Sequence, residues 1–410
     1  MYYNSYKNSI VKLKNVIAFF VAFSCIIYLR PYFIWESYKS GSFSYLRNLC
    51  ITLSYLLVFI YFFLGKKFNN ISKNKFYISI LFFIVDNFLL FCGNGYGLSI
   101  GNVLFHCFVI VLILYDDDLL KSIFKYFSLM FAISLIIPII TWFLLTLGVD
   151  LPHDTITPWE TIKLGNSWYD HYFLAVFRME KWGRKLLYLN GIYDEQGLVG
   201  TFCALFLIAD NMKIKNNLKN IILLIAGILT FSLAFYVMII LYFILTSHFS
   251  ISKKICIIVV FLFCLIICIN FFEKSLFVKE FLSRFFNLSL ANNRYNDSFS
   301  IFFQNNMQYN KFTTWFGHGK DSFGALNTSL GKNTMDASTY KILLYDYGYI
   351  GFFLLITFFL LGAYLYQKNL RGLVFSLIFV FSIYQRPYVL TFSYIVLFIS
   401  GNAMFKSYRE

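Results

Sequence analysis

Repeated apolar runs constrain this chain more than any other feature of its sequence. A helix of about 20 apolar residues, rising about 1.5 Å per residue, crosses the roughly 30 Å hydrocarbon core of a bilayer. Hydrophobic residues make up 59% of the 410 residues and charged residues only 13%, which is more apolar surface than a soluble domain needs. The apolar runs lie at about 16–34, 46–64, 76–92, 98–115, 127–147, 192–209, 220–247, 255–272, 341–366 and 372–405. We therefore expect an all-α polytopic membrane protein.

Positive charges lie between these runs and do not form one basic face. The formal net charge is +15, and the lysines and arginines gather in small clusters beside the apolar runs. This pattern is typical of membrane proteins, which retain Lys and Arg on the cytoplasmic side. Lys7, Lys12 and Lys14 precede the first run. We therefore expect the N-terminus in the cytoplasm, and we expect no nucleic-acid partner.

Two apolar runs are long for one membrane span and short for two. The run at 220–247 lies between Lys219 and Lys253 and would form a helix of roughly 40 Å. Its central "TFS" (230–232) favours a turn between two short or tilted spans. One long span is the alternative, and it would invert the topology of everything downstream. The run at 372–405 is broken by "QRPY" in the same way. Two hairpins bring the expected total to roughly 12 membrane helices, with both chain ends in the cytoplasm.

Two long hydrophilic segments then fall on the outer side of the membrane. Loops of this length are usually functional or disordered, and the aromatic content of these two favours folded caps. The expected organisation is N-terminal membrane helices at 1–147, a first outer loop at 148–191, central membrane helices at 192–272, a second outer loop at 273–338 and C-terminal membrane helices at 339–410.

The stretch "YLNGIYDEQGLVGTFCALFLI" contains two adjacent carboxylates, Asp194 and Glu195, in the first turn of a helix predicted over 192–211. The local interpretation is that both acids favour the positive end of the helix dipole at a wet interface. The functional interpretation is a carboxylate pair that faces an outer cavity, where it pairs with an arginine or acts as a base. Gly197 and Gly200 would let another backbone or a ligand come close.

Three segments resemble one known family. "NGIYDEQGLVGTFCALFLI" closely resembles the G-x-[YF]-x-E-P-G signature of bacterial O-antigen polymerases, also called oligosaccharide repeat unit polymerases, with Gln196 where many relatives have proline. "WFGHGKDSFG", followed by "STYKILLYDYGYIGFFLLI", resembles the second-loop pattern of this family, and "YQRPYVLTFSYIVLFI" resembles its C-terminal "RP" helix. The matches cover about 190–398 in the family's order. The resemblance implies a GT-C-like membrane glycosyltransferase with two large extracytoplasmic loops.

The resemblance also implies an activity. Members of this family transfer a growing glycan from an undecaprenyl-diphosphate carrier onto the terminal sugar of an incoming lipid-linked repeat unit, at the outer face of the bacterial inner membrane. The implied partners are the undecaprenyl-diphosphate-linked oligosaccharide and membrane lipid, together with a chain-length regulator and a flippase. The reaction is expected to need no nucleotide sugar and no cofactor. The product would be O-antigen or capsule.

A diphosphate leaving group calls for cations, and arginine suits it because it binds phosphate oxygens bidentately. Arg386 interrupts an apolar run, where an unpaired charge costs on the order of a few kcal/mol; an arginine that snorkels from a helix end is the alternative. Arg294 matches the arginine that relatives often carry early in the second loop. Arg178 and Arg184 fall on an expected amphipathic helix, which could instead lie flat on the headgroups. Arg284 is a further candidate.

The acceptor hydroxyl needs a base or an oriented hydrogen-bond partner. His318 is a candidate because histidine titrates near neutrality and glycines flank it in "FGHGKD"; a solvated loop histidine is the alternative. Glu195 and Asp194 are the other candidates for the catalytic base. Related O-antigen ligases carry a functional histidine at the start of the helix after the second loop, where this chain has "STY" (338–340). That difference disfavours a ligase and leaves Tyr340 as a candidate substrate-binding residue.

The sequence shows no metal-binding or nucleotide-binding constellation. HExxH, an outer DxD and clustered His and Cys spacings are absent. The run 116–118, three aspartates, falls on the cytoplasmic side, and we interpret it as a solvated turn.

Three other classes compete with the polymerase. They are an O-antigen ligase of the same fold, a lipid-linked oligosaccharide flippase or other transporter, and a non-enzymatic subunit of polysaccharide assembly. Transporters usually join their spans with short loops and show internal repeats, whereas this sequence has two long hydrophilic segments and no visible repeat. An intramembrane Arg386 counts against a purely structural subunit.

Overall fold

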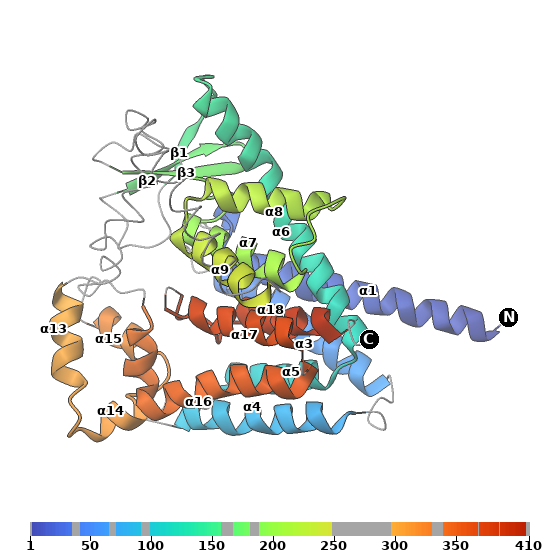
Figure 1. Ribbon diagram of the computed structural model, residues 1–410, viewed down its shortest axis with the longest axis vertical. Coiled ribbons are helices and arrows are strands. Elements are labelled where there is room, and N and C mark those ends of the chain that lie inside the picture. The colour runs from blue at the N-terminus through green and yellow to red at the C-terminus, as the bar shows by residue number, and fades with distance from the viewer. Residues whose placement is uncertain are drawn as a thin grey trace.

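The computed structural model describes residues 2–34, 42–64, 71–91, 99–156, 167–180, 188–247, 297–329, 339–367, 369–384 and 386–406. Over these residues the chain is mostly helical, as the apolar runs predict. Helices from distant parts of the sequence lie side by side in one bundle, and a small sheet and a group of short helices lie at its periphery (Figure 1).

The N-terminal half supplies five long helices to the bundle. They are α1 (Tyr2–Tyr28), α3 (Ser42–Leu64), α4 (Lys73–Phe91), α5 (Ile100–Leu114) and α6 (Asp117–Thr146), with a short 3-10 helix, η1 (Tyr32–Ile34), after α1. α6 begins well before its apolar run because Asp116 caps it: the Asp116 carboxylate accepts the backbone N–H of Leu119 at 3.2 Å. Charged residues in the first two turns hid this start from the hydropathy pattern.

The first long hydrophilic segment contains an antiparallel sheet. Its strands are β1 (Asp154–Ile156), β2 (Ser167–Tyr172) and β3 (Ala175–Glu180), in the order β1-β2-β3. The all-α prediction is wrong for this segment, and so is the amphipathic helix expected around Arg178. Both faces of β3 are covered: Val176 packs with Tyr169 against Ile27 of α1, and Phe177 joins the main core. Apolar side chains on both faces produce a continuous run that resembles a helix face.

The centre of the chain forms a short helix and a helical hairpin. α7 (Gln196–Ala209) is followed by α8 (Leu218–Leu229) and α9 (Leu233–Thr246). The break at 230–232 confirms the predicted turn within the long apolar run. The tip of the hairpin packs on α7 at Gly200, where an added Cβ would lie 2.5 Å from the Cβ of Ser232. The Tyr242 hydroxyl donates to Asn211 at 3.3 Å, so α9 returns toward the end of α7.

The C-terminal half contains three short helices and three longer ones. They are α13 (Asp297–Asn306), α14 (Phe312–Phe316), α15 (Ser322–Ser329), α16 (Lys341–Gln367), α17 (Leu370–Ser382) and α18 (Phe392–Phe405). The break between α17 and α18 falls at "QRPY", as the sequence predicts. α16 is kinked at Gly348, where φ is +67° and the backbone lies against Trp315. The predicted run at 255–272 and the start of the second loop lie outside the described residues.

Among the described residues, four helices are long and apolar enough to cross a membrane. They are Tyr45–Phe63, Lys73–Phe91, Asp117–Thr146 and Lys341–Gln367. The other apolar helices have 10–17 residues. The 14 residues of α7 correspond to about 21 Å, which is less than a bilayer core. Four helices of spanning length are the part of the 12-helix prediction that the structure bears out.

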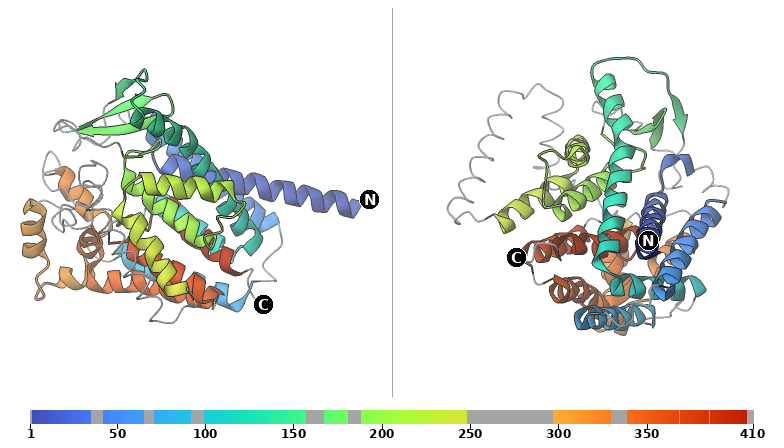
Figure 2. Two further views of the ribbon diagram at one scale, coloured as in Figure 1. Left: turned by 45° about the horizontal axis from the view of Figure 1, so that its top comes forward. Right: turned by 90° about the vertical axis from the view of Figure 1, so that its right-hand side faces the viewer.

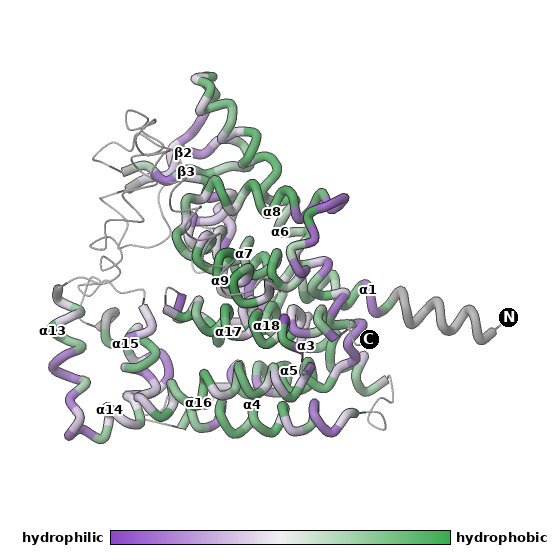
Figure 3. The backbone as a smooth tube through the Cα atoms, viewed as in Figure 1, coloured by the Kyte–Doolittle hydropathy of each residue, from purple (hydrophilic) through white to green (hydrophobic). Residues whose placement is uncertain are grey.

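The outside of the bundle is apolar. Hydrophobic residues dominate the long helices, and hydrophilic residues gather in the sheet, in α13 and near the helix ends (Figure 3). On α3, the side chains of Leu53, Leu56, Ile60 and Phe63 are all more than 40% exposed. Such a face is unfavourable in water and matches lipid acyl chains, in agreement with a membrane protein.

Both chain ends lie toward the same side of the bundle (Figure 2), and Asp117 joins several helix ends. Its carboxylate contacts the ammonium groups of Lys75 on α4 at 2.8 Å and of Lys406 after α18 at 2.7 Å. The Tyr366 hydroxyl, from the end of α16, donates to it at 2.5 Å. Interpreting this aspartate as part of a solvated turn was therefore wrong. Its partners come from remote segments, which no local pattern reveals.

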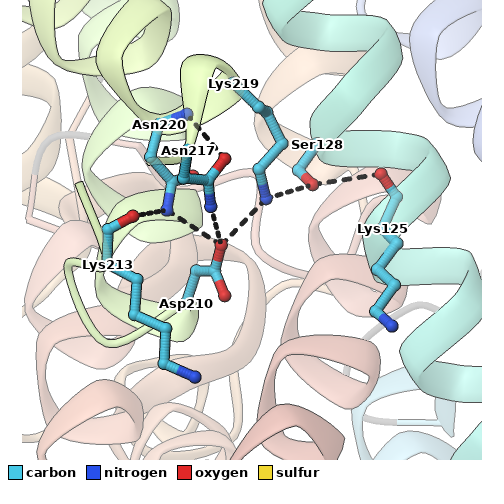
Figure 4. Close-up of polar contacts among 7 residues, drawn as sticks. All are labelled: Lys125, Ser128, Asp210, Lys213, Asn217, Lys219 and Asn220. Carbon is cyan, nitrogen blue, oxygen red and sulfur yellow. Dashed lines mark hydrogen bonds and ion pairs between the residues drawn. The ribbon is translucent and has the colours of Figure 1, made fainter. Parts of the chain in front are cut away.

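A second carboxylate, Asp210, fastens α8 to α7 and α6. It accepts hydrogen bonds from Asn217 at 3.3 Å, Lys219 at 3.0 Å and Asn220 at 2.9 Å (Figure 4). Lys219 also donates to Ser128 of α6 at 3.2 Å. The Lys219 and Asp210 side chains are only 15% and 13% exposed, so each buried charge has to be compensated by the other.

Asp210→Ala should lower the free energy of unfolding by about 3 kcal/mol, because Lys219 would be left buried without its carboxylate. Unfolding by sodium dodecyl sulfate in mixed micelles measures this loss. Asp118→Ala is the control: its ion pair with Lys14 is 3.6 Å long and its side chain is 78% exposed, so its loss should stay below about 1 kcal/mol. Equal losses in the two variants would contradict a fastening role for Asp210.

Candidate functional site

Non-helical segments meet inside the bundle next to the start of α7. Residues 188–195 precede α7, residues 230–232 join α8 to α9, and residues 386–391 lead into α18. Leu189 donates its backbone N–H to Leu229 at 3.1 Å, which ties the first two segments together. Every residue from 188 to 194 is buried. Irregular backbone at membrane depth is tolerated only where protein or a water-filled cavity surrounds it. These three segments therefore form a layer of the bundle that contains polar groups.

A tight turn places the start of α7 later than the sequence predicts. Gly191 has φ +70°, a conformation that suits glycine, and the backbone N–H of Tyr193 donates to Asn190 at 3.1 Å. α7 therefore starts at Gln196, and the helix predicted from residue 192 is corrected by four residues. Asp194 and Glu195 belong to the turn and not to the first helical turn.

Glu195 and Arg386 form a buried ion pair in this layer. Glu195 is the N-cap residue of α7, but its side chain does not cap the helix and contacts Nη1 of Arg386 instead. The Arg386 side chain is 8% exposed and that of Glu195 is 29% exposed. Gly197 makes room for the guanidinium, because a Cβ at this position would overlap Nη2 of Arg386. Neither local interpretation applies: the arginine does not snorkel, and Glu195 is not simply a helix-terminal acid.

Electrostatics keep the guanidinium charged. Burial disfavours the charge of Arg386, but the contacting Glu195 carboxylate compensates for it. A charged guanidinium whose partner is partly exposed can exchange that partner for another anion, and the structure of the pair therefore allows anion binding.

Asp194 is held through its backbone. Its carbonyl accepts the hydroxyl of Tyr169 at 2.7 Å and the side-chain amide of Asn190 at 3.2 Å. Tyr169 lies on β2 directly opposite Arg178 on β3, and opposite residues of an antiparallel pair share one face of the sheet. The predicted Arg178 therefore lies on the sheet face that contacts Asp194. The sheet thus covers the layer that contains the ion pair.

Two buried polar atoms near the ion pair have no hydrogen-bond partner among the described residues. They are Nε of Arg386 and the hydroxyl of Tyr394. Tyr394, on α18, is 3% exposed and interacts electrostatically with Arg386 and Glu195. Buried unsatisfied groups usually mark the place of a water molecule or a ligand. Tyr394 is not among the predicted site residues, because a tyrosine in an apolar helix resembles a core residue; its closeness to Arg386 along the chain was the available signal.

Tyr340, predicted to bind substrate, lies beside this layer. Its ring stacks on that of Tyr384 with 5.5 Å between the ring centroids. Tyr384 is two positions before Arg386 in the sequence. The structure therefore brings Tyr340 to the same segment as the arginine, and its ring contacts there are with Phe352 and Tyr384.

His318 belongs to a different cluster. Its ring stacks on Tyr345 with 4.0 Å between the centroids, and its Nδ1 lies 3.2 Å from the Tyr345 carbonyl. Burial lowers the pKa of His318, opposed by this carbonyl, so the ring is neutral near pH 7. Among the described residues, its contacts are to the α14–α16 region and not to Glu195 or Arg386. This arrangement therefore does not favour a direct role for His318 at the Glu195–Arg386 pair.

The remaining arginine candidates cannot be placed. Arg184, Arg284 and Arg294 lie outside the described residues. Within the described part of the chain, His, Cys, Asp and Glu side chains form no group of three or more that could hold a metal ion.

Comparisons with known proteins do not identify a relative. No protein-family model, no curated protein and no solved structure matches this chain. Its function is therefore argued from the site and from the motifs in its sequence.

Gly197→Ala should separate Glu195 from Arg386, because the new methyl group would occupy the space of the guanidinium. We expect a loss of about 3 kcal/mol in the free energy of unfolding, typical of a broken buried ion pair. Gly324→Ala is the matched control, since a Cβ at Gly324 meets no atom within 4 Å. A Gly197→Ala variant as stable as Gly324→Ala would show that the guanidinium moves aside at little cost.

Proposed function

We propose that the chain is a membrane glycosyltransferase that polymerises undecaprenyl-diphosphate-linked oligosaccharide repeat units into a surface polysaccharide, either O-antigen or capsule. One observation carries the proposal. Glu195 and Arg386 are 191 positions apart and come from two of the three segments that resemble the polymerase family, and their side chains are in contact. Chance matches of short motifs would not be expected to meet in a buried ion pair.

The proposed reaction is a substitution at the anomeric carbon of the growing glycan. The acceptor hydroxyl oxygen forms a bond to C1, and the bond between C1 and the diphosphate oxygen breaks, with its electron pair leaving on that oxygen. The hydroxyl proton passes to a carboxylate. The products are a glycan longer by one repeat unit and undecaprenyl diphosphate.

Arg386 is the proposed ligand of the leaving diphosphate. Negative charge develops on the departing oxygen, and a preorganised guanidinium in a water-poor layer stabilises it more than one in water would. The unsatisfied Nε of Arg386 and hydroxyl of Tyr394 supply further donors at the same place. Arg178, on the sheet face that contacts Asp194, is the proposed contact to the glycan or the second phosphate.

Glu195 is the proposed base. When the diphosphate takes over the guanidinium, the Glu195 carboxylate loses its partner and becomes available to accept the hydroxyl proton. Its side chain is 29% exposed, whereas Asp194 is 7% exposed. This difference in access favours Glu195 over Asp194, a choice that the sequence left open.

The proposal includes a location. We place the ion pair and the sheet at the outer face of the bacterial inner membrane and the Asp117 cluster at the cytoplasmic face, with roughly 12 helices in total. Two observations support this assignment. α18 runs from the Arg386 segment to Lys406, which pairs with Asp117, so the two clusters lie at opposite ends of one helix. Lys14 of α1 lies beside Asp118, at the end expected in the cytoplasm.

Arg386→Ala and Glu195→Ala should each lower the yield of long glycan by at least about 100-fold, since each removes a group that acts in the transition state. Glycan ladders from a strain that carries the variant show the effect as a collapse to single repeat units. Glu195→Gln, which keeps the shape of the side chain, should behave like Glu195→Ala, whereas Asp118→Ala should leave the ladder intact.

Two results would point to other classes. Long glycan that persists in both variants would remove Glu195 and Arg386 from the reaction. Loss of even single repeat units from the surface would indicate a transporter instead of a polymerase. Protein levels measured in the same membranes separate either result from failed insertion.

Topology reporters test the proposed orientation. Alkaline phosphatase fused after residue 170 or residue 310 should be active, because this enzyme folds only outside the cytoplasm, and green fluorescent protein fused after residue 215 should fluoresce. The opposite pattern would move the candidate site to the cytoplasmic face and exclude a lipid-diphosphate donor presented from outside.

A further inference from the structure

A second buried ion pair lies between α4 and α5, apart from the candidate site. Nδ1 of His106 is 2.6 Å from a carboxylate oxygen of Asp86. The two side chains are only 9% and 8% exposed. The ring of Phe82 lies against the imidazole, with 6.2 Å between the ring centroids. Ionisable groups within membrane helices are rare and usually functional.

The His106–Asp86 pair differs from the pairs that fasten the bundle. The carboxylates of Asp117 and Asp210 each accept from several donors in the structure. His106, by contrast, has a buried Nε2 with no hydrogen-bond partner in the described part of the chain. An unmet buried hydrogen-bonding group costs about 1–3 kcal/mol, so a partner for Nε2 would stabilise the pair.

The number of protons on His106 and Asp86 sets the net charge of the pair. The pair is electrically neutral overall when the imidazole Nε2 carries hydrogen and the pair holds one further proton, on Nδ1 or on the carboxylate. Loss of a proton leaves one negative charge in the bundle, and gain of a proton leaves one positive charge. Each proton exchanged therefore changes the charge between α4 and α5 by one unit, in a place where a net charge is unfavourable.

Few other charges face this pair. α16, which packs on α4, contributes Tyr347, and its hydroxyl is within electrostatic range of Asp86 and of Asp346 and Asp321. α3 and α18, which pack on α5, present the aromatic rings of Tyr55 and Phe392 to Phe108. Lys320 is the cation of this region, one helical turn away at Asn102.

A cavity lies about one helical turn from the pair. Asn102 lies one turn before His106 on the same face of α5, and its side chain accepts from Lys320 at 3.1 Å. Asn102, Lys320, Asp321 and Ala325 line a cavity of about 160 Å³, which has room for several water molecules. In the opposite direction α5 continues with buried apolar side chains, among them Phe108, Val109 and Leu112.

We propose that Asp86 and His106 form a proton-binding site inside the bundle, which exchanges its proton with water in the Asn102–Lys320 cavity. The ligand of this site is a proton, and its acceptor atoms are Nδ1 and Nε2 of His106 and the carboxylate of Asp86. The proposal does not rest on glycosyl transfer, since it concerns residues that the transfer site does not use.

Solid-state ¹⁵N NMR of the full-length chain in lipid vesicles, with its histidines labelled, tests this site. The chain has five histidines, and His106→Gln assigns the signals of His106 by their absence. We expect those signals to change with pH as the site gains and loses its proton, and to change at a different pH in Asp86→Asn. His318→Gln is the control and should leave them unchanged. The proposal would be overturned if the His106 signals did not change with pH, or if their pH dependence were the same in Asp86→Asn.

The route to water has its own test. Asn102→Leu should slow deuterium exchange at the His106 ring nitrogen by roughly tenfold or more, because exchange would then require local opening of the helix pair. Asn87→Leu is the matched control, since the Asn87 amide donates only within α4, to Phe83 at 2.6 Å. Equal rates in both variants would overturn the proposed route.

If Asp86→Asn does not fold, the double variant Asp86→Asn/His106→Asn keeps two hydrogen-bonding amides and must bind fewer protons than the native chain over the same pH range.

Discussion

A charged guanidinium inside an apolar bundle has to be paired, and this requirement organises the centre of the protein. Arg386 is almost fully buried, and its partner Glu195 comes from the opposite half of the chain. Neither residue could be buried alone without a large desolvation penalty. The turn before α7, the glycine at 197 and the break before α18 all serve to bring the two side chains together. The sheet then covers the same layer through Tyr169 and the carbonyl of Asp194.

The buried carboxylates fall into two groups with different hydrogen bonding. Asp117 accepts from donors on several helices and Asp210 from several donors at the start of α8, and such clusters hold elements in register. The other two pairs contain atoms without a hydrogen-bond partner among the described residues. These atoms are Nε of Arg386 and the Tyr394 hydroxyl at the Glu195–Arg386 pair, and Nε2 of His106 at the Asp86–His106 pair. Unsatisfied polar atoms cost free energy, so a ligand or proton bound at either pair would stabilise it.

The two pairs lie at contacts between different helices, so their proposed roles are separated in space. Glu195 and Arg386 lie where α7 and α18 begin, under the sheet. Asp86 and His106 lie between α4 and α5, near the turn that carries Lys320. Packed apolar side chains lie between the helices, so the proposed anion site and the proposed proton site can be separate within one bundle.

The sequence by itself determined most of the helices and the two breaks in the long apolar runs, since hydropathy and turn-forming residues act locally, and it named Glu195 and Arg386 as candidates. It did not predict the sheet around Arg178, because a strand buried on both faces lacks the alternation that identifies strands. Nor could it pair Glu195 with Arg386, choose between Glu195 and Asp194, or find Tyr394 and the Asp86–His106 pair. Contacts between residues far apart along the chain depend on how helices pack, and only the tertiary structure decides which buried polar groups meet.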